Sequence, residues 1–399
     1  MIIKNFVYRY NNRTNKFFNL YLLWGVLLMI VGVPKEIKNH EYRVGLTPSS
    51  VIELVKHGHS VIVEHDAGAA IDFIDEEYVA AGAKIVRKAE DIFSMAEMII
   101  KVKEPQPQEC KMLKEGQILY TYLHLAPDPD QTKLLVESGA TCVAYETVTD
   151  SLGGLPLLAP MSEVAGRMSV QAGAHHLEKA QGGRGVLLAG VPGVAPAKVL
   201  VIGGGVVGDN AASMAVGMNA DVTILDRSIA RLRQLDNEYE GRARCVFSTA
   251  AAIEEYALEA DLIIGAVLIP GAAAPKLLSR DLIKRMKKGS VIVDVAIDQG
   301  GCFETSKATT HEEPTYVVDD VVHYCVANMP GGVARTATMA LNNATLPFAI
   351  DLANDPVNAL FTNADLQNGL NVHKGIVTYK AVADALGYPY VPADEALKA

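Results

Sequence analysis

The feature that most constrains the fold of this chain is the glycine-rich run Gly203–Gly208, which fits the pattern G-x-G-x-x-G. The apolar segment Lys198–Ile202 precedes the run, and the segment Val206–Gly217 reads as a helix. A glycine-rich turn between a strand and a helix is typical of a dinucleotide-binding βαβ unit. The alternative interpretation is a strand–helix turn that binds nothing.

The individual glycines and one acid agree with a dinucleotide site. Gly203 permits the tight turn, Gly205 lets the backbone approach a pyrophosphate, and Gly208 permits close packing of the helix on the strand. The first helical turn offers free N–H groups and a positive dipole end to the phosphates. Asp226 ends the next strand, where a carboxylate accepts the ribose hydroxyls of NAD and repels a 2′-phosphate. The neighbouring Arg227 complicates this preference, because an adjacent arginine can serve NADP.

Short apolar segments alternate with helical segments on both sides of this motif, which predicts βαβ units, a mostly parallel sheet and right-handed crossovers. We expect an α/β chain with two doubly wound, mostly parallel-sheet domains. A Rossmann-type domain would span residues 158–334, and a discontinuous domain would combine 29–157 with 335–399, since the last helices have little core of their own. The predicted strands are 29–33, 61–64, 98–102, 118–124, 142–145, 198–202, 221–225, 245–248, 262–267 and 290–297. The main predicted helices are 48–56, 131–137, 163–179, 206–217, 229–239, 253–258, 280–288, 333–352 and 379–386.

Composition excludes several classes of protein. Half of the 399 residues are hydrophobic and 21% are charged, which rules out a disordered or fibrous chain. The net charge of −10 argues against a general nucleic-acid binder. The five cysteines are scattered and form no C-x-x-C pair, which predicts a reducing compartment and hence the cytoplasm.

Residues 1–28 differ from the rest of the chain, because they are rich in aromatic side chains and contain no acid. They read as a signal peptide or membrane anchor, as an additional surface helix, or as upstream codons that are not translated. No small-residue cleavage site follows the apolar segment Phe17–Leu28. Trp24-Gly25 requires a G-rich codon pair at the distance of a bacterial ribosome-binding site from Met29. We therefore favour a start at Met29, with no core contact for residues 1–28 and no membrane association.

Hydride transfer also needs a site for the second reactant, and three segments of the first domain supply candidates. Arg43 precedes a helix and could hold a carboxylate bidentately, or it could be a surface arginine. Lys101 and Lys103 close an apolar strand, so one of them should face the crevice beyond the strand ends, although a polar strand end is equally consistent. His124 ends another strand and can accept a proton near neutral pH, or it is a hydrogen-bonded structural histidine.

Two acids lie in an apolar segment of the second domain. In the predicted strand 290–297 and its continuation, alternation puts Asp294 and Asp298 on one face. Asp298 would lie at the carboxyl end of that strand, near the expected nicotinamide position. A carboxylate in such a site must be paired or take part in chemistry. No metal-binding constellation stands out, and we predict no metal.

From Met29 to near its end, the chain closely resembles the alanine dehydrogenase family. The resemblance covers almost the whole body of the chain, in order, and is more specific than any single motif. The segments that carry it are Gly32–Glu36, Glu41–Val44, Lys101–Pro105, Leu123–Leu125, Pro160–Arg167, Gly182–Val186, Asp294–Gly301 and Ala327–Pro330.

This resemblance implies a reversible NAD-dependent oxidative deamination of L-alanine to pyruvate and ammonium, usually by a homohexamer. It implies that Arg43 and Lys103 hold the substrate carboxylate and carbonyl, that His124 is the acid/base group, and that Asp298 is the second catalytic residue. One departure is that Asp351 and Asp355 replace an acid and a histidine that bind a metal in some relatives. The residues implied for NAD binding are Ser162, Gly203, Gly205, Val206, Val207, Gly208, Asp226, Arg231, Ser248, Val267, Leu268, Val295, Ala296, Ile297, Asp298, Val326, Ala327, Asn328 and Met329.

Other functions share parts of this pattern. The dinucleotide-binding subunit of proton-translocating transhydrogenase has the same fold and moves hydride between two cofactors, without a small substrate. Saccharopine-type and other amino-acid dehydrogenases are more distant alternatives. A non-enzymatic NAD sensor would keep Asp226 but have an inert pocket at His124. The presence of Arg43, Lys103, His124 and Asp298 together favours the dehydrogenase.

Overall fold

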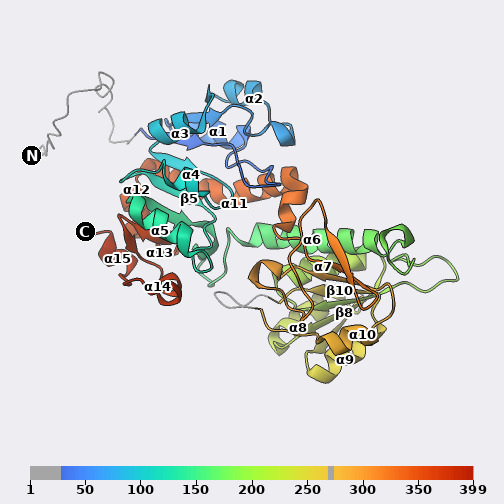
Figure 1. The fold of residues 1–399 in the computed structure, drawn as a ribbon. Coiled ribbons are helices and arrows are strands. Elements are labelled where there is room, and N and C mark those ends of the chain that lie inside the picture. The colour runs from blue at the N-terminus through green and yellow to red at the C-terminus, as the bar shows by residue number, and fades with distance from the viewer. Residues whose placement is uncertain (1–27, 268–273, 399) are drawn as a thin grey trace, which may run out of the picture.

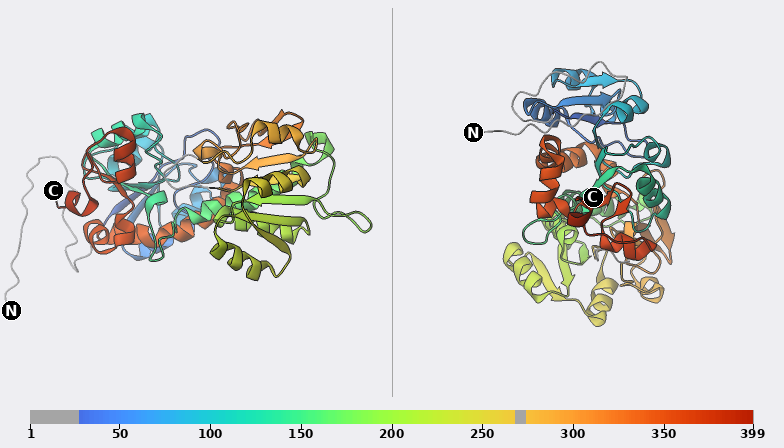
Figure 2. Two further views of the ribbon diagram at one scale, coloured as in Figure 1. Left: turned by 90° about the horizontal axis from the view of Figure 1, so that it is seen from below. Right: turned by 90° about the vertical axis from the view of Figure 1, so that its left-hand side faces the viewer.

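The computed structural model describes residues 28–267 and 274–398, which form two lobes (Figure 1). Segments from both ends of the chain build the first lobe, and the middle of the chain builds the second. Figure 2 shows this division from two further directions, with the blue and red parts of the chain in the same lobe. The predictions for residues 1–27 and for Leu268 lie outside the described residues.

The first lobe contains an eight-stranded sheet with the order β15-β14-β6-β5-β4-β1-β2-β3. Strands β1 to β6 are parallel and follow the doubly wound order 3-2-1-4-5-6. The C-terminal part of the chain then adds β14 antiparallel to β6, and β15 antiparallel to β14. The bounds are β1 Ile30–Val33, β2 Ser60–Glu64, β3 Lys84–Val86, β4 Met98–Ile100, β5 Ile118–Thr121, β6 Thr141–Ala144, β14 Leu370–His373 and β15 Ile376–Val377.

The second lobe repeats this architecture in a seven-stranded sheet with the order β12-β13-β11-β10-β7-β8-β9. Six strands are parallel in the same 3-2-1-4-5-6 order, and β12 is antiparallel to β13 at the edge. Two mostly parallel sheets with interleaved helices confirm the predicted α/β fold class. The bounds are β7 Lys198–Ile202, β8 Asp221–Asp226, β9 Ala243–Phe247, β10 Leu262–Gly265, β11 Val291–Asp294, β12 Thr315–Val318 and β13 Val321–Tyr324.

The helices begin where the sequence offers a cap. Thr47, Ser228 and Thr249 each accept a backbone N–H from the first turn of the helix that follows. The bounds are α1 Pro48–Lys56, α2 Asp75–Ala80, α3 Ala89–Met95, α4 Pro107–Cys110, α5 Pro129–Ser138, α6 Ala159–His176, α7 Val206–Gly217, α8 Ile229–Tyr239, α9 Ala250–Glu259, α10 Arg280–Arg285, α11 Ala334–Asn354, α12 Pro356–Thr362, α13 Ala364–Gln367, α14 Lys380–Leu386 and α15 Ala393–Ala396.

Helices α6 and α11 join the two lobes. Helix α11 buries Leu341 and Leu352 in the core of the first lobe, and α6 packs against both α11 and α7. The packing of α6 on α7 is close, because a Cβ at Gly166 would lie only 2.3 Å from the carbonyl oxygen of Val207. Within the described residues, no helix combines the length and apolarity needed to cross a membrane.

Several predicted boundaries are wrong. Strand β5 ends at Thr121 and not at His124, and β11 ends at Asp294 and not at Ile297. The three-residue strand β3 and the strands β12 to β15 were not predicted. Helix α6 spans Ala159–His176, whereas the predicted helix spans 163–179. It therefore begins four residues earlier and ends three residues earlier than predicted.

Candidate active site

Each sheet has a point where the strand order reverses, between β1 and β4 in the first sheet and between β7 and β10 in the second. Ligands of doubly wound folds bind beyond the carboxyl ends of the strands at such points. Glu36 and Lys103 follow the ends of β1 and β4, and the glycine-rich run follows β7. The candidate residues therefore gather at two crevices, one on each lobe.

The glycine-rich loop has the geometry of a ligand cradle. Gly203 has φ +103°, and a Cβ there would lie 2.7 Å from the carbonyl oxygen of Ala266. A Cβ at Gly208 would lie 1.7 Å from the carbonyl oxygen of Gly203, so α7 and β7 need a glycine for their close packing. At Gly205, by contrast, no protein atom lies within 4 Å of a Cβ. The fold itself does not demand a glycine there, and the space is open to a ligand.

Polar contacts hold this loop against β8 and α7. The Asp226 carboxylate accepts the N–H groups of Gly204 and Ser228, both at 2.7 Å. Nε of Arg231 donates to the Gly204 carbonyl oxygen at 2.6 Å, and its Nη2 donates to Oδ2 of Asp209 at 2.7 Å. No side chain caps the first turn of α7, so its N–H groups face the loop. These residues fit the diphosphate and ribose of a dinucleotide.

Arg43 is buried, with 2% of its side chain exposed. Its Nε and Nη2 donate to the two carboxylate oxygens of Glu41 at 2.7 and 2.6 Å, a bidentate pair. Burial would raise the pKa of Glu41, but the charge and hydrogen bonds of Arg43 outweigh it and lower that pKa to about 2. The remaining nitrogen, Nη1, contacts Sδ of Met161 at 3.0 Å. The two guanidinium nitrogens that we expected to hold a substrate thus bind Glu41. Within the described residues, Nη1 contacts only a thioether sulfur, a weak acceptor, so it is the nitrogen that a substrate carboxylate could bind.

Asn328 connects Arg43 to the second lobe. Its Oδ1 accepts from Nη2 of Arg43 at 2.7 Å, and its Nδ2 donates to Oε2 of Glu41 at 2.9 Å. Its backbone N–H donates to Oδ1 of Asp298 at 3.3 Å. Asn328 has φ +58°, a conformation that asparagine tolerates better than most residues. One asparagine thus links the candidate substrate arginine to the candidate catalytic acid.

The two lysines after β4 have different environments. Lys101 is fully buried, and its Nζ donates to Glu36 at 3.0 Å and to Glu109 at 2.8 Å. Burial alone would lower the pKa of Lys101, but these two carboxylates raise it instead. Lys103 is partly exposed, and its Nζ lies 3.5 Å from Glu104. Of the two lysines, Lys103 is the one that can reach a ligand.

His124 lies beyond β5, in a loop, with φ +50°. Its ring stacks on Tyr122, with centroids 5.8 Å apart and an interplanar angle of 6°. The side chain is 44% exposed, and Nδ1 lies 3.9 Å from Oε1 of Glu146. A half-exposed ring beside a carboxylate has the environment of a proton-transfer group.

The prediction that Asp294 and Asp298 share one strand face is wrong. Asp294 ends β11 and is fully buried, where it accepts the N–H groups of Ala296 and Cys302 and the hydroxyl of Ser306. Burial raises its pKa. The chain then turns, and Asp298 lies exposed in the short 3-10 helix Ile297–Gln299. Asp294 therefore anchors the turn that carries Asp298.

The other candidates for cofactor binding lie on five segments. Ser162 lies in the first turns of α6, and the N–H of Ser248 donates to the carbonyl oxygen of Asp226 at 2.9 Å. Val267 follows β10, residues 295–297 follow β11, and residues 326–329 follow β13. All but Ser162 thus follow carboxyl ends of strands in the second sheet.

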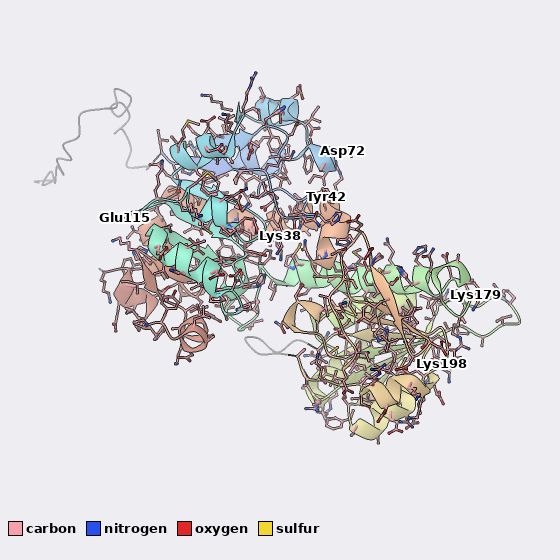
Figure 3. The ribbon with its side chains drawn as sticks, in the orientation of Figure 1. Lys38, Tyr42, Asp72, Glu115, Lys179 and Lys198 are labelled. Carbon is pink, nitrogen blue, oxygen red and sulfur yellow. The ribbon has the colours of Figure 1, made fainter. Side chains whose placement is uncertain are left out.

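A groove of about 630 Å³ lies between the lobes. Its lining includes Tyr42 and Asp72 from the first lobe. His311 and Gly332, from the segment between β11 and α11, also line it. Figure 3 labels Tyr42 and Asp72 on the side of the first lobe nearest the second, and Glu115 at the opposite side. Tyr42 adjoins Arg43 in the chain, so the groove reaches the segment that carries the buried ion pair.

Three contact residues of the candidate site were not predicted from the sequence. Glu41, Glu146 and Met161 contact Arg43 or His124 but were not proposed as site residues. Only Glu41 carried a local signal, because it lies two residues before Arg43 and a buried arginine needs a nearby acid. The other two come from distant parts of the chain.

Comparison with known families decides the relationship. The family description "Alanine dehydrogenase/PNT, N-terminal domain" matches residues 32–165, and "Alanine dehydrogenase/PNT, C-terminal domain" matches residues 169–380. The chain belongs to the alanine dehydrogenase/PNT family. This result confirms the resemblance drawn from the sequence motifs.

Individual members of the alanine dehydrogenase/PNT family are closely similar over nearly the whole chain. The alanine dehydrogenase of Halomonas elongata is 64% identical over 366 residues, which cover 92% of this chain and 99% of that protein. The alanine dehydrogenase of Methanococcus maripaludis is 55% identical over 371 residues, covering 92% and 100%.

Solved structures of the family give the same order of similarity. A structure of L-alanine dehydrogenase matches with a TM-score of 0.88 and 53% identity, covering 90% of this chain and 99% of that one. The transhydrogenase of Sinorhizobium meliloti matches with a TM-score of 0.75 and 27% identity, covering 88% and 99%. Transhydrogenase is therefore the more distant of the two relatives.

Proposed function

We propose that this protein catalyses the reversible NAD-dependent oxidative deamination of L-alanine to pyruvate and ammonium. The observation that carries the proposal is the link from Arg43 through Asn328 to Asp298, which joins a buried cation of one lobe to an exposed acid of the other. Such a link suits a small anionic substrate held between two lobes. The high identity to proteins named alanine dehydrogenase supports the same activity.

NAD fits the second lobe. The open space at Gly205 and the uncapped first turn of α7 suit a pyrophosphate, and the Asp226 carboxylate suits the ribose hydroxyls. Arg231 supports this loop by binding the Gly204 carbonyl oxygen. When bound there, NAD would supply the acceptor for a hydride from Cα of alanine. The exposed Arg227 next to Asp226 makes the preference over NADP a point to measure.

The first lobe would bind the substrate and move protons. In our proposal the alanine carboxylate docks on Nη1 of Arg43, displacing the Met161 sulfur, and Lys103 binds the oxygen that becomes the pyruvate carbonyl. Loss of hydride leaves an iminium carbon, to which water adds while His124 takes a proton from that water. His124 then returns that proton to the nitrogen. The C–N bond breaks and ammonia leaves, while the hydroxyl proton passes to His124 as the C=O bond forms. Asp298 orients the water or the amine.

We propose a homo-oligomer, of the hexameric order that the family resemblance implies. A loop spanning residues 182–197 projects from the second lobe, as Figures 1 and 2 show. Its Leu187, Val191 and Val194 are 62%, 54% and 63% exposed, an apolar tip that a second copy would cover. Light scattering of the purified protein measures the number of subunits.

We also propose a cytoplasmic location. All five cysteines are free thiols, which supports a reducing compartment.

The experiment that tests the activity separates the two family members. Pyruvate, ammonium and NADH are supplied together, and the loss of NADH absorbance is compared with that in mixtures lacking ammonium or pyruvate. In parallel, NADPH is offered with an oxidised NAD analogue. We expect NADH loss that requires both pyruvate and ammonium. Hydride transfer between nucleotides without those substrates would contradict the proposal and favour a transhydrogenase.

A further inference from the structure

Glu146 lies beside His124 because of the topology of the first sheet. Strands β5 and β6 are parallel neighbours in register from Ile118↔Thr141 to Thr121↔Ala144, so their carboxyl ends lie side by side. The chain leaves β6 directly into the 3-10 helix Tyr145–Thr147, which carries Glu146. Two residues that are distant in sequence are thereby brought to one edge of the sheet.

The Glu146 carboxylate holds the backbone of the His124 loop. Its Oε1 accepts the N–H of His124 at 2.6 Å, and both of its oxygens lie 3.2 Å from the N–H of Leu123. The Glu146 side chain is 13% exposed. His124 has a left-handed backbone conformation, which a residue with a side chain keeps only when its surroundings impose it. These N–H contacts supply that constraint.

The same carboxylate also faces the imidazole ring. Oε1 lies 3.9 Å from Nδ1, within ion-pair range, while Tyr122 stacks against the ring face. The hydroxyl of Tyr122 donates to the carbonyl oxygen of Leu157 at 2.5 Å, so the stacking partner is itself fixed. A carboxylate near one ring nitrogen favours the proton on that nitrogen, which leaves the other nitrogen as an acceptor.

We infer that Glu146 is a positioning residue for His124: it holds the loop in its left-handed turn and directs the proton of the neutral ring to Nδ1, so that Nε2 accepts protons. This inference rests on the proposed function for the part that concerns turnover. Glu146 touches neither reactant in this account and acts through the histidine. Its contribution should therefore appear in kcat and in the tautomer of one ring.

The kinetic test compares Glu146→Gln with Glu146→Asp. The glutamine keeps an oxygen for the backbone N–H groups but removes the charge, and we expect kcat for L-alanine oxidation to fall roughly 10- to 100-fold. KM for NAD should stay within about twofold, because the cofactor loop lies on the other lobe. The aspartate keeps the charge and should recover part of kcat. Equal kcat in wild type and Glu146→Gln, or no recovery in Glu146→Asp, would overturn the inference.

The matched control is Asp128→Asn. Asp128 is also a carboxylate in the segment after β5, and it accepts the backbone N–H of Gln131 at 3.0 Å, but this contact caps α5 and does not face the His124 ring. We expect the control to keep wild-type kcat. A loss of kcat equal to that of Glu146→Gln would mean that any weakened loop slows turnover, which would overturn the inference.

A spectroscopic measurement separates this inference from the proposed function. The protein is labelled with ¹⁵N-histidine, and the resonances of His124 are identified among those of the ten histidines by their loss in His124→Gln. At a pH where the ring is neutral, we expect the Nδ1–H tautomer in wild type and in Asp128→Asn, and a shift toward Nε2–H in Glu146→Gln. An Nε2–H ring in wild type, or identical spectra in all variants, would overturn the inference whether or not the protein oxidises alanine.

Discussion

Oδ1 of Asn328 accepts a hydrogen bond from Nη2 of Arg43 at 2.7 Å, although the two residues belong to different lobes. The same asparagine donates through its backbone N–H to Asp298. The position of one residue therefore sets the relation between a candidate substrate group and a candidate catalytic acid.

The first prediction concerns Asn328→Gly. Glycine adopts the φ of +58° without strain, so the variant removes the bridging side chain while relieving the backbone. We expect kcat/KM for L-alanine to fall about 10- to 100-fold, since misplaced groups lose orientation, with little change in Tm. Lys374→Gly is the control, because Lys374 also has a positive φ but is exposed on the far edge of the first sheet. Steady-state kinetics of both variants check this, and an unchanged kcat/KM in Asn328→Gly would contradict it.

The second prediction concerns acid stability and Glu41. The pKa of Glu41 is about 2 in the folded protein, below its ordinary value of 4.5. The ion pair with Arg43 therefore stabilises the fold above pH 4.5, by about 3 kcal/mol, and this contribution is lost as the pH falls toward 2.

Glu41→Gln should cost about 3–5 kcal/mol at pH 7, because it leaves the buried Arg43 charge without its partner. The difference from wild type should shrink by more than about half at pH 3. Urea unfolding at the two pH values measures this, with the exposed Glu53→Gln as control. The same difference at both pH values would refute the assignment.

The third prediction concerns Lys101, the only described cation within hydrogen-bond distance of Glu36 and Glu109. Lys101→Met leaves two buried carboxylates unpaired and should cost about 3–5 kcal/mol of folding free energy. Adding Glu36→Gln and Glu109→Gln should restore part of the loss. Lys133→Met, on an exposed pair with Glu137, should change stability by less than about 0.5 kcal/mol. Thermal unfolding measures the stability of these variants. If Lys101→Met were as stable as Lys133→Met, the buried cluster would not stabilise the first lobe as proposed.

The fourth prediction pairs two glycines of one loop. Gly208→Ala places a Cβ 1.7 Å from a carbonyl oxygen and should destabilise the second lobe by about 3 kcal/mol. Gly205→Ala meets no protein atom within 4 Å and has an ordinary φ of −69°, so Tm should not fall. It should nevertheless weaken NADH binding at least about tenfold, or by 1.4 kcal/mol, by blocking the proposed pyrophosphate approach. Fluorescence titration checks the affinity, and tight NADH binding by Gly205→Ala would count against this placement of the diphosphate.

Local patterns predicted the elements with strong start and stop signals. Helices α1, α7 and α8 and strand β7 have the predicted bounds, because each combines a cap or glycine turn with a clear apolar period. Strand β3 was not predicted because it has only three residues and begins with an exposed lysine. Strand β14 was not predicted because Asn371 and His373 interrupt its apolar pattern, and these side chains are buried in the sheet beside β6. Strand β15 was not predicted because it has only two residues.

The sequence indicated candidate residues at strand ends but not the residues that contact them. Strand ends placed one of Lys101 and Lys103, together with Asp226 and the glycine loop, at the edges where parallel strands end. His124 and Asp298 were assigned to strands that in fact end earlier, since alternation continues in the sequence past the last paired residue. Contacts such as that of Glu146 with His124 depend on β5 and β6 being neighbours, which no local pattern encodes.

The most direct test of the whole account is NADH formation from L-alanine and NAD by the wild type and by His124→Ala, with NADP and amino-acid-free reactions alongside. We predict alanine-dependent NADH in the wild type, and a loss of about 100-fold or more in kcat for His124→Ala with NADH binding retained. Wild-type protein that binds NADH but makes none from alanine would contradict the account, as would a His124→Ala variant that turns over at the wild-type rate.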